Sequence, residues 1–93
     1  MKLFKATVEG RGFTLPVDGV LRRIGFVTTR EVLANNVTQA KHRLLKSFKA
    51  EDKFRKILGA STSQGEVHLV ELLHCDVPSL NPINPGYAFF PDD

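Results

Sequence analysis

The residue types that most resemble a metal site are three histidines, a cysteine and an aspartate: His42, His68, His74, Cys75 and Asp76. His68 and His74 would share one face of a strand, but six residues of extended chain separate them by about 20 Å. No ligand spacing such as C-x-x-C or H-E-x-x-H occurs. The pattern therefore favours partly buried strand histidines over a metal centre, and it predicts no cofactor.

The thiol of Cys75 next to His74 is the arrangement closest to a catalytic nucleophile. Covalent catalysis needs a base within hydrogen-bond reach of the nucleophile and a third group that orients the base. Adjacent residues on a strand point to opposite faces, and no third group is evident. Neither a serine elbow nor a glycine-rich phosphate loop occurs. The sequence therefore predicts no catalytic residue and favours a protein that is not an enzyme.

Basic side chains gather between residues 41 and 56. Four of them would line one side of a continuous helix: Lys46, Lys49, Lys53 and Lys56. Such a row could neutralise the phosphates of a nucleic acid. However, the net charge of +3 is well below that of a dedicated nucleic-acid binder. A solvated helix face is therefore the favoured interpretation, and nucleic-acid binding is the alternative.

One charged residue, Arg30, falls in the middle of a predicted strand with the sequence TTREV. A guanidinium on a sheet pairs with a carboxylate or extends to water. The candidate partners are the carboxylates of Glu71, Asp92 and Asp93. A structural ion pair is favoured, and a small ligand-binding or enzymatic pocket near Arg30 is the alternative.

Three segments have the patterns of strands. Residues 2–9 alternate between apolar and polar, which predicts a strand. The glycines of 10–12 are expected to end it. A loop or wide hairpin follows, in which a short irregular strand could lie. Residues 24–34 are rich in β-branched side chains and would span about 36 Å, about twice the usual length, which predicts a bulge at Gly25 or an overhang. Residues 66–77 are apolar on both faces, as a central or doubly covered strand is.

The segment between the last two strands has the spacing of an amphipathic helix. Asn36 is a favourable N-cap, and Gln39 three positions later completes a capping-box pattern. The apolar stripe weakens near residue 50 and then resumes, which predicts either one bent helix or a long helix followed by a short one. Gly59 is the expected stop.

These elements predict an α+β fold, with a mostly antiparallel sheet of three or four strands and one main helix on one face. Residues 1–93 form a single domain, with a β-β-α-β body at 1–77 and a proline- and aromatic-rich tail at 78–93. The start of the chain lacks the apolar run of a signal peptide, and no segment is long enough to span a membrane. A cytoplasmic protein is therefore expected.

The tail carries three aromatic rings within four residues, at Tyr87, Phe89 and Phe90. Water disfavours such exposed apolar surface, and extended segments pair readily with sheet edges. The rings are therefore the candidate interface, docked on the chain's own sheet or on that of a second copy. Long strands beyond one small core favour the second copy, and a twofold homodimer is the expected partner arrangement.

The stretch GFVTTREVLANNVTQA together with the ending NPGYAFFPDD resembles a group of short bacterial proteins without an assigned activity. This resemblance implies no catalytic residues. The β-α-β order is also similar to antitoxins of the HicB kind, although the acidic-glycine strand motif and the DNA-binding extension of those proteins are absent. The sequence as a whole predicts a small, self-associating binding or assembly domain.

Overall fold

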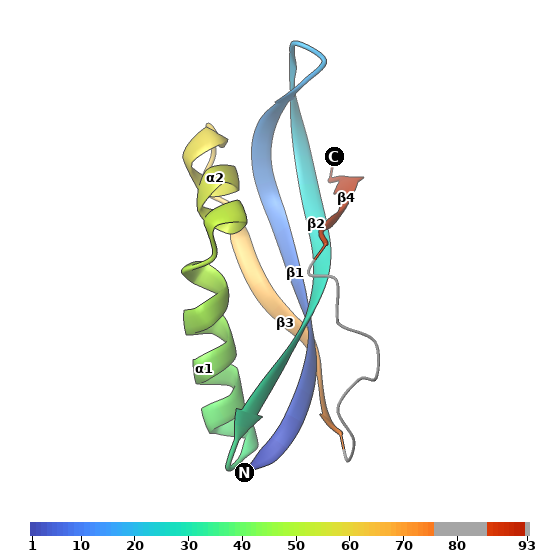
Figure 1. The fold of residues 1–93 in the computed structure, drawn as a ribbon. Helices are drawn as coiled ribbons and strands as arrows, with labels where there is room; N and C mark the ends of the chain where they lie inside the picture. Colours follow the sequence, from blue (N-terminus) through green and yellow to red (C-terminus); the bar gives the residue numbers. More distant parts are fainter. Residues whose placement is uncertain (76–85, 93) are drawn as a thin grey trace.

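The computed structural model describes residues 1–75 and 86–92, which form an antiparallel sheet with two helices on one face (Figure 1). The elements are β1 (Lys2–Val17), β2 (Val20–Ala34), α1 (Val37–Lys49), α2 (Asp52–Ala60), β3 (Glu66–Cys75) and β4 (Ala88–Pro91). The four strands lie in the order β3-β1-β2-β4. The predicted α+β fold is therefore confirmed.

A long hairpin of β1 and β2 forms the centre of the sheet. Its register runs from Lys2 opposite Ala34 to the turn, and a bulge lies between Gly10 and Phe13. Gly12 accommodates this bulge with a φ of 77°, which favours glycine. The prediction that the first strand ends at the glycines of 10–12 is therefore wrong. The strand bends there and continues, so the bulge lies in β1 and not at Gly25.

The two helices begin and end largely where the sequence places them. The Asn36 side chain accepts a hydrogen bond from the Gln39 amide at 2.8 Å, and the Gln39 side chain accepts one from the Asn35 amide at 2.7 Å. Glu51 has an extended backbone, with φ of −68° and ψ of 136°, and separates α1 from α2. The alternative of a long helix followed by a short one is confirmed. Gly59 lies inside α2, so the predicted stop is wrong.

Aromatic rings fill the space between the sheet and the helices. Phe26 of β2 is 1% exposed, and its ring lies 5.7 Å from Phe13, 6.0 Å from Phe48 and 6.3 Å from Phe54. Tyr87 completes the group, with its ring 5.0 Å from that of Phe26. Because these rings come from two strands, both helices and the tail, a single contact group joins almost every part of the fold.

The third strand lies at the edge of the sheet and not in its centre. Within residues 1–75 and 86–92, β3 pairs only with β1, and a bulge at Val70 shifts its register, so that Glu71 lies opposite Thr7. This extra residue turns the following side chains to the other face. The prediction that His68 and His74 share a face is therefore wrong, as is the prediction of a central strand. Val70 and Leu73 are 54% and 51% exposed.

Candidate functional site

The aromatic tail lies on the chain's own sheet, as strand β4. Ala88 to Pro91 pair with Val27 to Ile24 of β2 in antiparallel register. Phe90 covers Gly25 on one face, and a Cβ at that glycine would lie 2.6 Å from the Phe90 ring. Tyr87 is half-buried and Phe89 half-exposed on the other face. The three predicted interface rings are thus divided between both faces of one short strand.

The guanidinium of Arg30 pairs with Glu51, a partner that the sequence analysis did not name. Nε donates to Glu51 Oε2 at 2.8 Å and Nη2 donates to Oε1 at 2.6 Å, in the bidentate geometry that arginine forms with carboxylates. Nη1 donates to the Thr29 carbonyl and to the Thr28 hydroxyl. The Arg30 side chain is 12% exposed, so its hydrogen bonds are used within the protein.

Two of the predicted partners of Arg30, Glu71 and Asp92, lie elsewhere. Glu71 lies opposite Thr7, and adjacent residues of a strand alternate between faces, so its side chain is on the outer face of the sheet. Asp92 pairs with Arg11 at 2.8 Å, and Asp93 lies outside the described residues. The expected structural ion pair therefore exists, but with Glu51, which the helix break places beside β2.

Tyr87 joins this ion pair to the tail. Its hydroxyl donates to Glu51 Oε1 at 3.1 Å, and the Thr28 hydroxyl donates to the Gly86 carbonyl at 2.9 Å. Burial, and then the negative charge of Glu51, raise the pKa of Tyr87 to about 12. The hydrogen bonds from Arg30 lower the pKa of Glu51. The group Thr28, Arg30, Glu51 and Tyr87 is called the tail anchor below.

The chain contains one tyrosine and no tryptophan, so alkaline titration reports Tyr87 alone. We expect tyrosinate absorbance to appear with a midpoint near pH 12 in the folded protein and near 10 in denaturant. Because the pKa of Tyr87 is higher in the folded protein, protonated Tyr87 contributes to the free energy of unfolding. This contribution is complete below pH 10 and is lost as the pH rises toward 12. Glu51→Gln should lower the folded midpoint, since it removes the neighbouring charge. A folded midpoint equal to that in denaturant would show that the anchor does not form.

A second contact holds the end of the tail against the bulge of β1. The carboxylate of Asp92 accepts a hydrogen bond from the Gly12 amide at 2.7 Å and pairs with Arg11. Arg23 lies 3.7 Å from the same carboxylate, and the Asp92 amide donates to the Arg23 carbonyl at 3.0 Å. The Gly12 amide, followed by Arg11, lowers the pKa of Asp92. An acidic residue is therefore bound in extended conformation at this edge of β2.

The four predicted nucleic-acid contacts are exposed, but they do not form one row on one helix. Lys46 and Lys49 are on α1, whereas Lys53 and Lys56 are on α2, beyond the break at Glu51. The Lys53 ammonium lies 5.1 Å from the centre of the Tyr87 ring and 5.9 Å from that of Phe89. One of the four thus covers the tail, and contact with nucleic acid stays a prediction.

The described members of the metal-like set, His42, His68, His74 and Cys75, are spread over the molecule. His68 lies beside Glu66 on the outer face, whereas His74 packs against Phe4 on the helix face. In residues 1–75 and 86–92, no three histidine, cysteine, aspartate or glutamate side chains converge on a common point. Asp76 lies outside these ranges. In the same ranges, neither helix is long and apolar enough to cross a bilayer.

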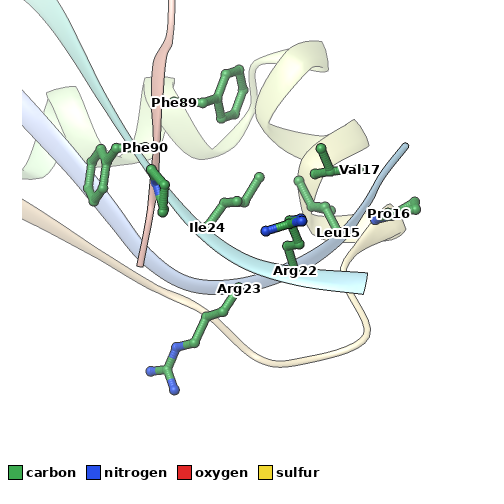
Figure 2. A pocket seen from close by; sticks show the side chains of 9 residues that line it. Leu15, Pro16, Val17, Arg22, Arg23, Ile24, Phe89 and Phe90 are labelled. Carbon is green, nitrogen blue, oxygen red and sulfur yellow. The ribbon is translucent and has the colours of Figure 1, made fainter. Parts of the chain in front are cut away.

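An open groove of about 430 Å³ lies between the hairpin tip and β4 (Figure 2). Its apolar lining comes from the hairpin and the tail, with Leu15, Pro16, Val17, Ile24, Phe89, Phe90 and Pro91. Arg22 and Arg23 are its charged members. Figure 2 shows Phe89 and Phe90 on opposite sides of β4, beside β2. The groove therefore combines apolar surface with positive charge at the rim of the sheet.

Sequence reasoning missed Glu51 and this groove for one reason. Both depend on segments far apart in the chain, because the helix break meets β2 and the tail meets the hairpin tip. The only local signal was the unusual length of the strand at residues 24–34, which predicted an overhang. No family model, curated protein or solved structure matches the chain.

Proposed function

We propose that the chain is a small, non-catalytic binding or assembly domain of the cytoplasm that forms homodimers through the outer edge of β3, which no described strand covers. The observation that carries this proposal is a ten-residue strand at the edge of the sheet that exposes two large apolar side chains, Val70 and Leu73. An edge strand presents unpaired amide and carbonyl groups, and proteins usually protect such edges with charge, proline or a short length. β3 carries the exposed charges of Glu66 and Glu71, but it also exposes Val70 and Leu73 and contains no proline. Its single cysteine fits a reducing compartment.

The tail rings are not the basis of this proposal. Tyr87 contacts the core through Phe26, and Phe90 covers Gly25 of the same chain. The sequence predicts an interface at the tail, whereas the proposed interface lies at the opposite edge of the sheet. Pairing there would extend two four-stranded sheets into one, and the helices would stay on a single face.

The bulge at Val70 restricts the register of such a dimer. In β3, Leu69 and Leu72 face the helices, whereas His68 and Leu73 face away, as their partners on β1 show. Residues opposite each other in an antiparallel pair share a face. An arrangement with Leu69 of one copy opposite Leu72 of the other satisfies this condition. It also places His68 opposite Leu73 and Glu66 opposite Cys75.

Two charges on the exposed edge should abolish the dimer. We expect Val70→Lys/Leu73→Lys to be a folded monomer, because lysines on an edge strand oppose strand pairing. Light scattering after size exclusion would compare it with the unmodified chain at the same concentration. The matched control is Leu33→Lys/Leu58→Lys, at similarly exposed apolar positions away from β3, which should remain dimeric. A monomeric unmodified chain would refute the proposal.

A disulfide can test the register itself. With Glu66 opposite Cys75, the Cα atoms would lie about 4.5–5.5 Å apart, within the range of a disulfide. Mild oxidation of Glu66→Cys should therefore give covalent dimers through the native cysteine. Within one chain, these two positions are at opposite ends of β3 and cannot meet. Glu66→Cys/Cys75→Ser is the control, and dimers formed equally by it would contradict this register.

A further inference from the structure

The tail places an accessible aromatic ring, that of Phe89, on the helix face of the sheet. Phe89 lies opposite the buried Phe26, yet it is 48% exposed. Its ring centre lies 6.3 Å from that of Phe26, and it stacks on Tyr87 at 6.1 Å with an angle of 17° between the planes. Two other rings therefore fix the position of Phe89, while about half of its surface contacts water.

Two lysines of α2 lie on the side of the helix that meets this ring. The Lys53 ammonium is 5.9 Å from the centre of the Phe89 ring. Lys56 follows one turn later, and residues three apart are neighbours on a helix surface. Both lysines are exposed, and neither forms an ion pair with a carboxylate of residues 1–75 and 86–92.

The acidic residues at the start of α2 do not cancel this positive charge. Glu51 is held by Arg30 in bidentate geometry, so its charge is already neutralised. Asp52 is the first residue of α2, where the positive end of the helix dipole stabilises a carboxylate. The two lysines therefore leave an excess of positive charge beside the exposed ring.

The open groove at the hairpin tip gives access to the same ring. Phe89 is part of the lining of this groove, together with apolar side chains of the hairpin such as Leu15 and Ile24. Figure 2 shows Phe89 projecting from β4 on the side opposite to Phe90. A flat molecule in the groove can therefore contact the ring while a charged group attached to it reaches α2.

We propose that the surface formed by Phe89, Lys53 and Lys56 binds single-stranded nucleic acid. A base stacks on the exposed part of the Phe89 ring, and neighbouring phosphates pair with the two lysines. Proteins that bind single strands combine aromatic rings with positive charge, because every base has a π-face and every nucleotide carries a phosphate. The ring is already held in position, so binding requires little further ordering of the protein.

Two other anionic partners match this surface less well. The bases of a duplex stack on each other, so a duplex offers only phosphates to the lysines and leaves Phe89 without a partner. An acidic peptide pairs with the lysines in the same way, but its carboxylates bring no aromatic face. The combination of ring and cations therefore favours an unpaired strand.

The test uses the full chain and a short, fluorescein-labelled oligothymidylate, with binding followed by fluorescence anisotropy. We expect binding that weakens with salt, with a slope of about −1.4 in log K against log salt for two phosphate contacts. A duplex of the same length and a polyglutamate of equal charge should each bind about fivefold more weakly. No binding of the oligothymidylate at low salt, or equal affinity for polyglutamate, would overturn the proposal.

The ring is tested by two substitutions of different chemistry. Phe89→Leu should weaken binding by about tenfold, because it keeps an apolar side chain but removes the stacking surface. Phe89→Tyr keeps that surface and should bind as the unmodified chain does. Circular dichroism verifies that both variants fold. An unchanged affinity in Phe89→Leu would show that charge alone binds the strand, against the proposal.

The position of the cations is tested at constant net charge. Lys53→Gln/Lys56→Gln should weaken binding by about tenfold and reduce the salt slope. The matched control is Lys5→Gln/Lys41→Gln, at exposed positions opposite Leu73 on the sheet and beside Leu69 on α1, and it should bind normally. Equal losses in the two variants would overturn the proposal. None of the substituted residues is on β3, so all variants should keep the oligomeric state of the unmodified chain, and failure of the homodimer is a separate result.

Discussion

Phe26→Ala is expected to destabilise the fold by about 3–5 kcal/mol, the largest loss of any single substitution considered for this chain. The Phe26 ring is buried and contacts rings from β1, both helices and the tail. Its removal leaves a cavity that these rings cannot close together, since they are held on different elements. Domains of this size are stable by about 5–15 kcal/mol, so the variant should be close to unfolding. Urea denaturation followed by circular dichroism measures the change.

Phe89→Ala is the matched control for this prediction. It removes the same ring from a half-exposed position on β4, 6.3 Å from Phe26. The expected cost is below about 1.5 kcal/mol, because about half of the Phe89 surface already contacts water. Equal losses in the two variants would contradict the central role of Phe26. They would indicate instead that the tail and the core unfold as one unit.

Arg30→Ala is expected to cost about 1–2 kcal/mol and to release the tail. The substitution leaves Glu51 without its bidentate partner and removes the cation that lies 5.5 Å from both the Phe48 and Tyr87 rings. Loss of one partner from a fully buried ion pair costs more, but the Glu51 side chain is 29% exposed and water compensates in part. Urea denaturation gives the stability, and hydrogen exchange of the β4 amides reports the release.

The pH dependence of stability distinguishes loss of the ion pair from loss of packing. The folded pKa of Glu51 is lowered, so its contribution is present above the unfolded value near 4.5 and is lost as the pH falls through the folded value. Arg30→Ala should remove most of this acid-dependent part. Lys46→Ala, at an exposed position of α1, is the control and should keep it. Undiminished acid sensitivity in Arg30→Ala would show that another group produces it.

Much of the fold follows from local patterns in the sequence. The β-branched side chains of residues 24–34 predicted the long strand β2, because such side chains pack well on a pleated sheet. The capping pair Asn36 and Gln39 predicted the start of α1 through hydrogen bonds that span only a few residues. The weakening of the apolar stripe near residue 50 predicted the break between the helices. These features depend on near neighbours in the chain, so the sequence carries them directly.

The errors arose where one residue changes the face or the end of a strand. The glycines at 10–12 predict the end of a strand, but Gly12 lies in a bulge while β1 stays paired with β2. A bulge at Val70 reversed the facing of the residues after it, which no pattern of period two can reveal. The alternation of residues 66–77 is apolar on both faces and predicts a central strand, yet β3 lies at the edge. Hydrophobicity alone does not distinguish an edge strand from a central one.

The sequence alone determined the fold class, the capped first helix and the need to bury an aromatic tail, since each follows from residue type and spacing. Only the tertiary structure decided the strand order, the choice of Glu51 as the partner of Arg30, and the groove at the hairpin tip. These depend on which distant segments come together. Contacts between segments far apart in the chain leave no periodic signal in either segment, and for that reason they had to be read from the folded molecule.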